Sequence, residues 1–315
     1  MAEVLTIGET MVLMSPKERG YLHYVKDYEM KIAGAESNLA VGVSKLGHSA
    51  EWISNLGEDE FGMVVQNAVR AEGVHTEHVT FMSEYRTGLM FKQMQSAETA
   101  VFYYRENSAA SHMCAEQVTD EMIKDCKILH LTGITPVLSE SCEQMIWKAM
   151  ETAEKNHVMI SFDPNVRRKL WKDKDYSSML GEMTMRADIV MLGIDEGKAL
   201  FGVEDPEDIL NRILEQGKAQ FIALKNGAKG AIVADRKQHI TIAPYPCQCV
   251  DPIGAGDAFN AGFLCGILEG RGLEECGKMG AIAGAMATEN NGDIEGYPTR
   301  KQLENRLHEN QEVYR

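Results

Sequence analysis

The sequence predicts an α/β protein in which helices cover both faces of a mostly parallel central sheet, with a small β-sheet lid beside it. Three observations lead to this expectation. From about residue 120 onward, short apolar runs alternate with helical segments. The composition, 44% hydrophobic and 25% charged over 315 residues, suits a large buried core. Two stretches rich in Tyr and Met, about residues 9–33 and 85–106, break the alternation.

The elements of the α/β part follow from apolar runs bounded by polar or turn residues. The expected strands, in chain order, are Val4–Gly8, Lys127–Leu131, Val158–Phe162, Asp188–Leu192 and Phe221–Leu224. The expected helices are Glu140–Asn156, Asp205–Gly217, a segment that follows Gly256, and Thr299–Arg315. Ligands in parallel α/β sheets bind beyond the carboxyl ends of the strands, so the loops after these strands are where a site is expected.

The two stretches that break the alternation predict the lid. Gly88–Met94 and Thr99–Arg105 are β-prone, and the polar Gln95–Glu98 between them predicts a hairpin. A competing interpretation makes both stretches edge strands of the main sheet. The chain has neither internal repeats nor a low-complexity linker, so we expect one domain over 1–315.

Charge and cysteine content exclude some classes of protein. A formal net charge of −15 argues against a nucleic-acid partner, because a polyanion needs a basic face. The N-terminus lacks the features of a secretory signal, and no apolar run reaches the ~18 residues of a membrane span. Seven scattered cysteines favour a reducing cytoplasm over a disulfide framework. Cys247 and Cys249 are too closely spaced for a common zinc motif, and we expect them to be strand residues that face one side.

The most informative segment is VDPIGAGDAFNAGFLCGIL, residues 250–268. Gly254, Ala255 and Gly256 immediately precede the expected helix, and such small residues let backbone N–H groups approach an anion. Asp257 comes next, where a carboxylate can take a proton from a hydroxyl that attacks a phosphoryl group. The spacing fits equally well an aspartate that only caps the helix.

The same segment carries a family resemblance. D-x-x-G-A-G-D-A-F-x-A-G-F at 251–263 resembles the C-terminal signature of the ribokinase family of carbohydrate kinases, although Pro252 stands where Thr is common. AGAESNLA at 33–40, with LG at 46–47 and NLG at 55–57, resembles the family's N-terminal sugar-binding segment. Two signatures in the family's order, far apart in the chain, are more specific than either alone.

The resemblance covers essentially the whole chain. It implies a ribokinase-like three-layer α/β/α domain with a β-sheet lid, ATP as the phosphoryl donor and Mg²⁺ as its partner. It also implies that Asp257 is the catalytic base and that the amides of Gly254, Ala255 and Gly256 form the anion hole.

The resemblance extends to the nucleotide loops. KNGAKG at 225–230 resembles the family's K-x-G-x-x-G turn beside the nucleotide, although a plain hairpin turn explains the same residues. The implied ATP-binding residues are Asn165, Lys225, Gly227, Gly230, Gly254 and Gly256.

The family's metal-binding motif is only partly matched in this sequence. Glu196 matches the acidic residue of the family's N-x-x-E motif, which helps to hold Mg²⁺, but Gly193 replaces the Asn. Asp195 is therefore a second candidate ligand, since Mg²⁺ prefers oxygen ligands.

One loop indicates the substrate. FDPNVRRKLW at 162–171 resembles 2-keto-3-deoxygluconate kinases, as do GAE at 34–36 and YYR at 103–105. That sugar carries a carboxylate, which a guanidinium can bind through charge-assisted bonds worth about 1.5–3 kcal/mol each. Alternatively, Arg105 and Arg167 pair with surface acids. The implied substrate-binding residues are Gly34, Asn38, Tyr103, Arg105, Arg167, Asp257 and Asp293.

We therefore expect a cytoplasmic enzyme that phosphorylates the 6-hydroxyl of 2-keto-3-deoxygluconate. The alternatives are a kinase of the same fold for fructose, 5-dehydro-2-deoxygluconate or a nucleoside, and a sugar sensor without activity. A nicotinamide-dependent dehydrogenase is disfavoured, because Gly8-Glu9-Thr10 ends the first strand where G-x-G-x-x-G would begin. The resemblance leaves K⁺ activation open and favours a homo-oligomer, either a dimer through the lid or a larger assembly.

Overall fold

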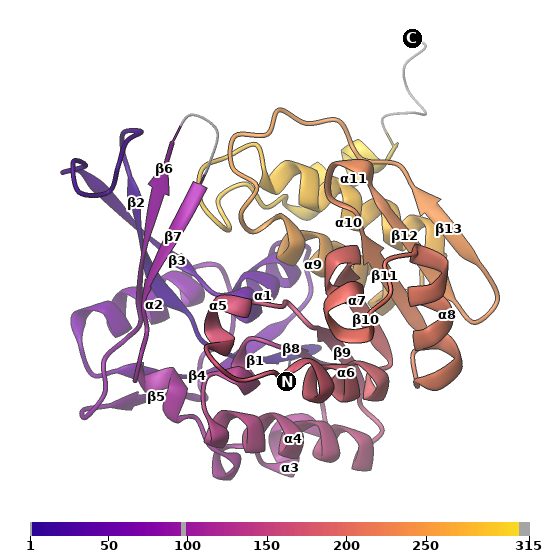
Figure 1. The fold of residues 1–315 in the computed structure, drawn as a ribbon, viewed down its shortest axis with the longest axis horizontal. Helices are drawn as coiled ribbons and strands as arrows, with labels where there is room; N and C mark the ends of the chain where they lie inside the picture. Colours follow the sequence, from indigo (N-terminus) through magenta and orange to yellow (C-terminus); the bar gives the residue numbers. More distant parts are fainter. Residues whose placement is uncertain (1, 96–98, 309–315) are drawn as a thin grey trace.

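The computed structural model describes residues 2–95 and 99–308. Within them, nine strands form the main sheet in the order β13-β12-β11-β10-β9-β8-β1-β4-β5 (Figure 1). Neighbours from β11 to β5 run parallel, and β11, β12 and β13 pair antiparallel at one edge. The strands are β1 (Val4–Ile7), β4 (Ala50–Gly57), β5 (Val79–Met82), β8 (Ile128–Thr132), β9 (Met159–Asp163), β10 (Ile189–Gly193), β11 (Phe221–Lys225), β12 (Ala231–Asp235) and β13 (His239–Ile242). The five strands expected from the sequence are confirmed to within one residue at either end.

Helices cover both faces of this sheet, so the predicted three-layer architecture is confirmed (Figure 1). One face packs around a core that includes Trp52, Phe263 and Ile282. Its helices are α1 (Ala35–Lys45), α2 (Glu60–Ala71), α9 (Ala255–Leu268), α10 (Leu273–Ala287) and α11 (Arg300–His308). The other face packs around Leu131 and Phe162. Its helices are α3 (Asp120–Ile123), α4 (Glu140–Lys155), α6 (Ser177–Arg186), α7 (Ile194–Phe201) and α8 (Pro206–Gln216), and the short α5 (Arg168–Trp171) follows β9.

Local sequence signals start the two helices that were predicted between strands. Ser139 caps α4 by accepting a hydrogen bond from the Cys142 amide at 3.1 Å. Asp205 caps α8 in the same way, and Pro206 stands at its first position, where a missing N–H costs nothing. None of the helices in these described ranges is both long and apolar enough to cross a bilayer.

A second sheet of four strands lies beside the main one. Its order is β3-β2-β6-β7, with β2 and β6 parallel and the other pairs antiparallel. The strands are β2 (Met11–Pro16), β3 (Tyr28–Ala33), β6 (Leu89–Met94) and β7 (Thr99–Tyr104). They are therefore not edge strands of the main sheet. Of the expected hairpin turn Gln95–Glu98, residues 96–98 lie outside the described residues.

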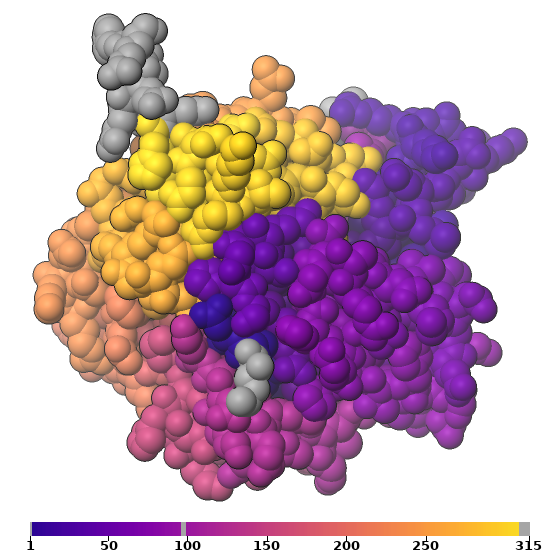
Figure 2. All heavy atoms as spheres, turned by 180° about the vertical axis from the view of Figure 1, so that it is seen from behind, coloured from indigo at the N-terminus to yellow at the C-terminus, as the bar shows by residue number. Residues whose placement is uncertain are grey.

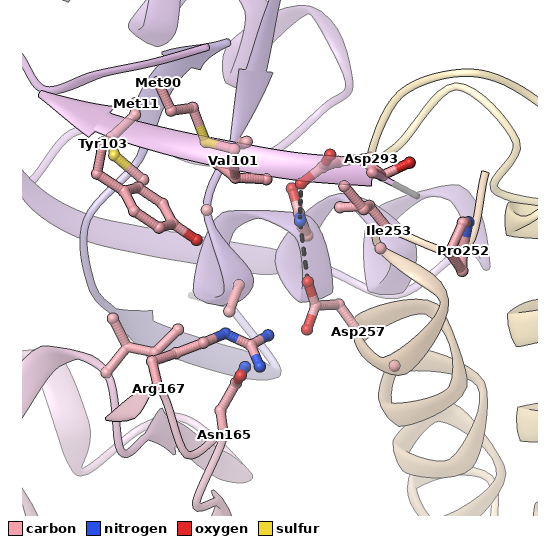
Figure 3. Close-up of a pocket in the computed structure, with 18 of the residues that line it drawn as sticks. Met11, Met90, Val101, Tyr103, Asn165, Arg167, Pro252, Ile253, Asp257 and Asp293 are labelled. Carbon is pink, nitrogen blue, oxygen red and sulfur yellow. Dashed lines mark hydrogen bonds between the residues drawn. The ribbon is translucent and has the colours of Figure 1, made fainter. Parts of the chain in front are cut away.

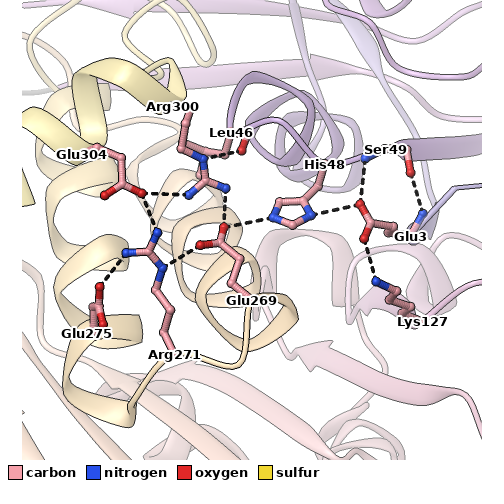
Figure 4. A network of polar contacts seen from close by, with 10 residues as sticks. All are labelled: Glu3, Leu46, His48, Ser49, Lys127, Glu269, Arg271, Glu275, Arg300 and Glu304. Atoms are coloured by element: carbon pink, nitrogen blue, oxygen red, sulfur yellow. Dashed lines mark hydrogen bonds and ion pairs between the residues drawn. The ribbon is translucent and has the colours of Figure 1, made fainter.

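The C-terminal helices pack against the N-terminal half of the chain, as the rear view shows (Figure 2). A polar network joins the two (Figure 4). His48 contacts Glu3 through Nδ1 at 2.9 Å and Glu269 through Nε2 at 3.0 Å. Arg300 pairs with Glu269 and donates to the Leu46 carbonyl at 2.8 Å. The N-terminal strand is thus tied to α9 and α11. Of the helix expected over Thr299–Arg315, residues 309–315 lie outside the described range.

One prediction about local structure was wrong. Cys247 and Cys249 are exposed and lie in an irregular segment between β13 and α9, not in a strand. Pro244 and Pro246 explain the difference, because proline has no N–H to donate to a β-ladder.

Candidate active site

A cavity of about 800 Å³ lies between the small sheet and the carboxyl ends of the main strands (Figure 3). The small sheet contributes Met11, Met90, Val101 and Tyr103. The ends of β9 and β11 contribute Asp163 and Lys225, and the loop after β9 contributes Asn165 and Arg167. Glu196 comes from α7, and Gly254, Gly256 and Asp257 come from the turn before α9 and its start. The cavity therefore occupies the position at which an α/β sheet binds ligands.

Asp257 lies in the first turn of α9, and the residue that caps this helix is Gly254. The interpretation of Asp257 as a simple cap is therefore wrong. Its Oδ2 accepts a hydrogen bond from Asn38 Nδ2 at 2.9 Å. Burial raises the pKa of Asp257 to about 6, although the hydrogen bond from Asn38 opposes the shift. A carboxylate with such a pKa can accept a proton near neutral pH.

The start of α9 forms an anion cradle. Gly254 has φ 80°, and a Cβ there would lie 2.2 Å from the Asp293 carbonyl oxygen, so the turn requires glycine. Throughout the described part of the chain, the amides of Gly256 and Asp257 find no backbone acceptor. Ala255, by contrast, does not line the cavity, and its amide donates to the Pro252 carbonyl at 3.4 Å. Two unpaired amides and the helix dipole thus face the cavity beside Asp257.

Asn38 joins Asp257 to a second buried acid. Its Nδ2 also donates to Asp293 Oδ2 at 3.1 Å. Burial raises the pKa of Asp293 to about 7. Oδ1 of Asp293 and Oδ1 of Asn38 are buried without a partner in the residues that the structure describes. These oxygens are acceptors left for ligand hydroxyl groups. Gly34 also lines the cavity, where a Cβ would lie 2.4 Å from the Glu9 carbonyl oxygen.

Lys225 lies on the floor of the cavity in a network of its own. Its Nζ donates to Asp163 Oδ2 at 2.8 Å and to Asn260 Oδ1 at 3.2 Å. Asn260 donates in turn to Asp163 Oδ2 at 2.6 Å. Gly256 lies close by, since a Cβ there would be 3.9 Å from Lys225 Nζ. This fixed ammonium is placed to attract a phosphate group bound at the start of α9.

The glycines after Lys225 lie elsewhere. Gly227 and Gly230, with φ 51° and 92°, form the turn between the antiparallel strands β11 and β12. Neither lines the cavity. The hairpin interpretation therefore accounts for both glycines in this structure.

The two candidate metal ligands differ in position. Glu196 lines the cavity and accepts hydrogen bonds from the amides of Val166 and Gly193, both at 2.7 Å. Asp195 is exposed and does not line the cavity. No group of three or more His, Cys, Asp or Glu side chains in residues 2–95 and 99–308 is arranged to hold a metal ion.

Arg105 is held by an acid that the sequence analysis did not single out. The Arg105 side chain is 9% exposed and forms an ion pair with Glu9, whose side chain is 1% exposed. Glu9 also accepts a hydrogen bond from Ser108 Oγ at 2.5 Å. Arg105 therefore pairs with a buried acid of the cavity wall, not with a surface acid. The Arg105 guanidinium carbon lies 5.7 Å from the centre of the Tyr103 ring.

Arg167 is exposed at the cavity rim and has no ion pair within the described ranges. Its guanidinium points toward Asp257 and Asn165 (Figure 3). Its charge is one of the smaller influences that lower the pKa of Asp257 against the effect of burial. An unpaired guanidinium beside Asp257 can bind an anionic group.

Sequence reasoning assigned no role to three acids of this cavity: Glu9, Glu36 and Asp163. Glu36 is fully buried, and its Oε1 accepts from the hydroxyls of Thr132 and Thr135, both at 2.7 Å. Glu9 lies just after β1 and Asp163 is the last residue of β9, and this position at the carboxyl end of a main-sheet strand was the available signal.

A phosphotransferase that acts on an alcohol needs a base for the hydroxyl and fixed positive groups for the phosphoryl, and this cavity places both together. The chain is such an enzyme, as its relatives make plain. Residues 1–300 match the model of the pfkB family carbohydrate kinases, and the chain belongs to this family.

Individual relatives agree over nearly the full length. The 2-dehydro-3-deoxygluconokinase of Bacillus subtilis (strain 168) is 34% identical over 96% of this chain and 94% of its own. That of Thermoproteus tenax is 29% identical over 98% and 94%. The structure of a putative ribokinase II from E. coli in complex with ATP and Mg²⁺ superposes with a TM-score of 0.91 at 25% identity, covering 98% of this chain and 100% of that one.

Proposed function

We propose that this kinase transfers a phosphoryl group from ATP to the 6-hydroxyl of 2-keto-3-deoxygluconate, also called 2-dehydro-3-deoxygluconate. The observation that carries the proposal is the presence of Arg105 and Arg167 in the same cavity as Asp257. A neutral sugar offers no anionic group to two guanidinium ions, whereas a sugar acid does. The names of the two curated relatives support the same substrate.

The sugar lies between the small sheet and α1 in this proposal. Arg105, held in place by Glu9, and Arg167 bind the carboxylate, and Tyr103 closes over the chain of the sugar. The unpartnered oxygens of Asn38 and Asp293 accept hydrogen bonds from the sugar hydroxyls. The small sheet acts as the lid, which excludes water from the transfer.

ATP lies at the other end of the cavity, over Lys225 and the start of α9. Asn165, Gly254 and Gly256 line that part of the cavity, and these residues fit a phosphate chain. Mg²⁺, when bound with ATP, neutralises charge on the phosphates. Glu196 is the residue that would hold it, through water or directly, and an incomplete protein cage suits an ion that keeps several waters.

Asp257 accepts the proton of the 6-hydroxyl as that oxygen bonds to the γ-phosphorus of ATP and the bond to the bridging oxygen breaks, which releases ADP. The amides of Gly256 and Asp257 stabilise the charge that develops on the phosphoryl oxygens. Lys225 adds a positive charge that its ion pair with Asp163 keeps in position.

The test is ADP release with ATP·Mg²⁺, comparing 2-keto-3-deoxygluconate with fructose, ribose, adenosine and 5-dehydro-2-deoxygluconate. We expect the highest kcat/KM for 2-keto-3-deoxygluconate. A preference for 5-dehydro-2-deoxygluconate would keep the carboxylate-binding arginines but change the substrate. A preference for neutral sugars would overturn the roles of both arginines, and turnover of none would favour a sugar sensor.

We also propose a homodimer through the small sheet. Met30, Phe102 and Tyr104 on its edge strands β3 and β7 are 53%, 42% and 62% exposed. Phe102→Lys should convert the dimer to a monomer in sedimentation, and an unchanged assembly would place the contact elsewhere.

The seven free thiols support a reducing cytoplasm. Replacement of K⁺ by tetramethylammonium in the assay tests K⁺ activation, which the family resemblance leaves open.

A further inference from the structure

Lys92 is a lysine of the small sheet that is removed from water completely. It lies on β6 with 0% of its side chain exposed, and its ammonium forms an ion pair with Asp251, which is 1% exposed. A charge at such depth is strongly destabilising unless it is paired. The pair therefore links β6 firmly to the segment that precedes α9.

Asp251 organises the turn that leads into α9. Its Oδ1 accepts from the Ile253 amide at 3.3 Å, within the same turn. Its Oδ2, the oxygen that pairs with Lys92, also accepts from the Gly292 amide at 3.2 Å. One carboxylate thus joins the turn before α9 to the loop that carries Asp293.

These two segments are in direct contact where the anion cradle begins. Gly254 lies against the Asp293 backbone so closely that no Cβ fits between them. Tyr297 Oη donates to the Gly254 carbonyl at 2.9 Å on the same side. A shift of the turn at Asp251 therefore moves Gly254, and with it the first amides of α9.

We propose that Lys92 is a positioning residue for phosphoryl transfer, which acts through Asp251 to hold the start of α9 and the Asp293 loop in their catalytic arrangement. This inference rests on the proposed function, because it takes the start of α9 as the anion hole. Lys92 is not among the residues that line the cavity, so it does not touch the substrates. It makes the small sheet part of the catalytic framework, not only a cover.

The electrostatics of Asp293 are consistent with this role. Burial, together with the charges of Asp257 and Asp251, raises the pKa of Asp293 to about 7, and the charge of Lys92 opposes this shift. Asp293 and Asp257 share the Asn38 amide. The ammonium of Lys92 thus favours the ionised form of an acid next to the base.

Lys31 provides a matched control on the same sheet. It lies on β3 and donates to the Asn291 carbonyl at 2.6 Å, so it also ties the small sheet to the Asp293 loop. Its ion pairs are with Glu29 and Glu295, and it does not contact Asp251. If activity needs only some link between the small sheet and the Asp293 loop, substitution of either lysine should lower kcat. If activity needs the contact with Asp251, only substitution of Lys92 should lower it.

The experiment compares the full-length wild type with Lys92→Met/Asp251→Asn and with Lys31→Met. The double variant leaves no lone buried charge, so it avoids the main cause of unfolding in Lys92→Met. We expect its kcat to fall about 10- to 100-fold, the cost of misplacing catalytic groups by about 1 Å, with KM for the sugar within about threefold. Affinity for ADP with fluoroaluminate, which mimics the transferring phosphoryl, should fall in proportion. Lys31→Met should keep the wild-type kcat.

Hydrogen exchange supplies a readout that does not depend on the substrate. Peptides covering 251–257 should exchange faster in the double variant than in the wild type at equal thermal stability, and those of Lys31→Met should not. Wild-type kcat and exchange in the double variant would overturn the proposal, as would an equal loss of kcat in Lys31→Met. If the wild type phosphorylates no sugar, the proposed function fails, and the exchange data alone decide whether Lys92 holds the turn.

Discussion

Asp257 and Asp293 are held by the two hydrogens of one amide: Asn38 Nδ2 lies 2.9 Å from Oδ2 of Asp257 and 3.1 Å from Oδ2 of Asp293. Burial is the largest cause that raises the two pKa values, to about 6 and about 7, and the charge of Asp257 contributes to the shift of Asp293. Because the two acids interact, their protons leave in steps that belong to the pair. This relationship determines how the enzyme should respond to pH.

The first prediction is a loss of activity in acid. A base works when it is deprotonated, so kcat/KM should decrease as the pH falls through about 6, the pKa of Asp257. Rates between pH 5 and 8.5 measure this. An inflection near the ordinary aspartate value of about 4 in the wild type would contradict the buried environment.

The second prediction concerns the base itself. Asp257→Asn keeps the size of the side chain but removes its proton acceptor, and kcat should fall by about 10²–10⁴. Steady-state kinetics at saturating ATP and sugar check this. Asp195→Asn, at an exposed position outside the cavity, is the matched control and should be neutral. A near-normal kcat for Asp257→Asn would remove this residue from the role of base.

The third prediction concerns Arg167 at the rim of the cavity. Arg167→Ala should raise KM for 2-keto-3-deoxygluconate by about 10- to 100-fold, the worth of a charged hydrogen bond, with a smaller effect on kcat. Arg168→Ala changes an equally exposed neighbour that does not line the cavity, and KM should stay unchanged. An equal loss on fructose and on the acid sugar would mean that Arg167 does not bind the carboxylate.

The fourth prediction concerns stability. Burial raises the pKa of Glu36 to about 7, and its Oε2 is buried without a partner among the described residues. A carboxyl group whose pKa is higher in the folded than in the unfolded protein stabilises the folded state at a pH below its unfolded pKa. This stabilisation is lost as the pH rises through the folded pKa, about 7 for Glu36. Glu36→Gln should therefore stabilise the protein at pH 8 by up to about 3 kcal/mol, and much less at pH 5.

Thermal unfolding at both pH values measures the effect of Glu36→Gln. Glu77→Gln, which alters an exposed carboxyl, serves as the control. Equal unfolding temperatures of Glu36→Gln and wild type at pH 8 would show that the Glu36 carboxylate is well solvated or paired.

Local sequence patterns were enough to predict the α/β architecture of this protein. Apolar runs such as Val158–Phe162 become buried strands whatever lies around them, and Gly254 to Asp257 can be recognised because the phosphate chemistry needs contiguous residues. The pair of Arg105 with Glu9 and that of Lys92 with Asp251 join segments far apart in the chain, and no local pattern specifies them. Cys247 and Cys249 had β-prone spacing, but the prolines beside them prevented a ladder.

The use of residues from both ends of the chain has a consequence for biosynthesis. Asn38 leaves the ribosome before Asp257 and Asp293, which follow it by 219 and 255 residues. Domains form from the N-terminus onward during translation, so a nascent chain can build most of the main sheet before Asp257 is made. A chain that stops before Asp257 can therefore contain most of the sheet but not the completed cavity.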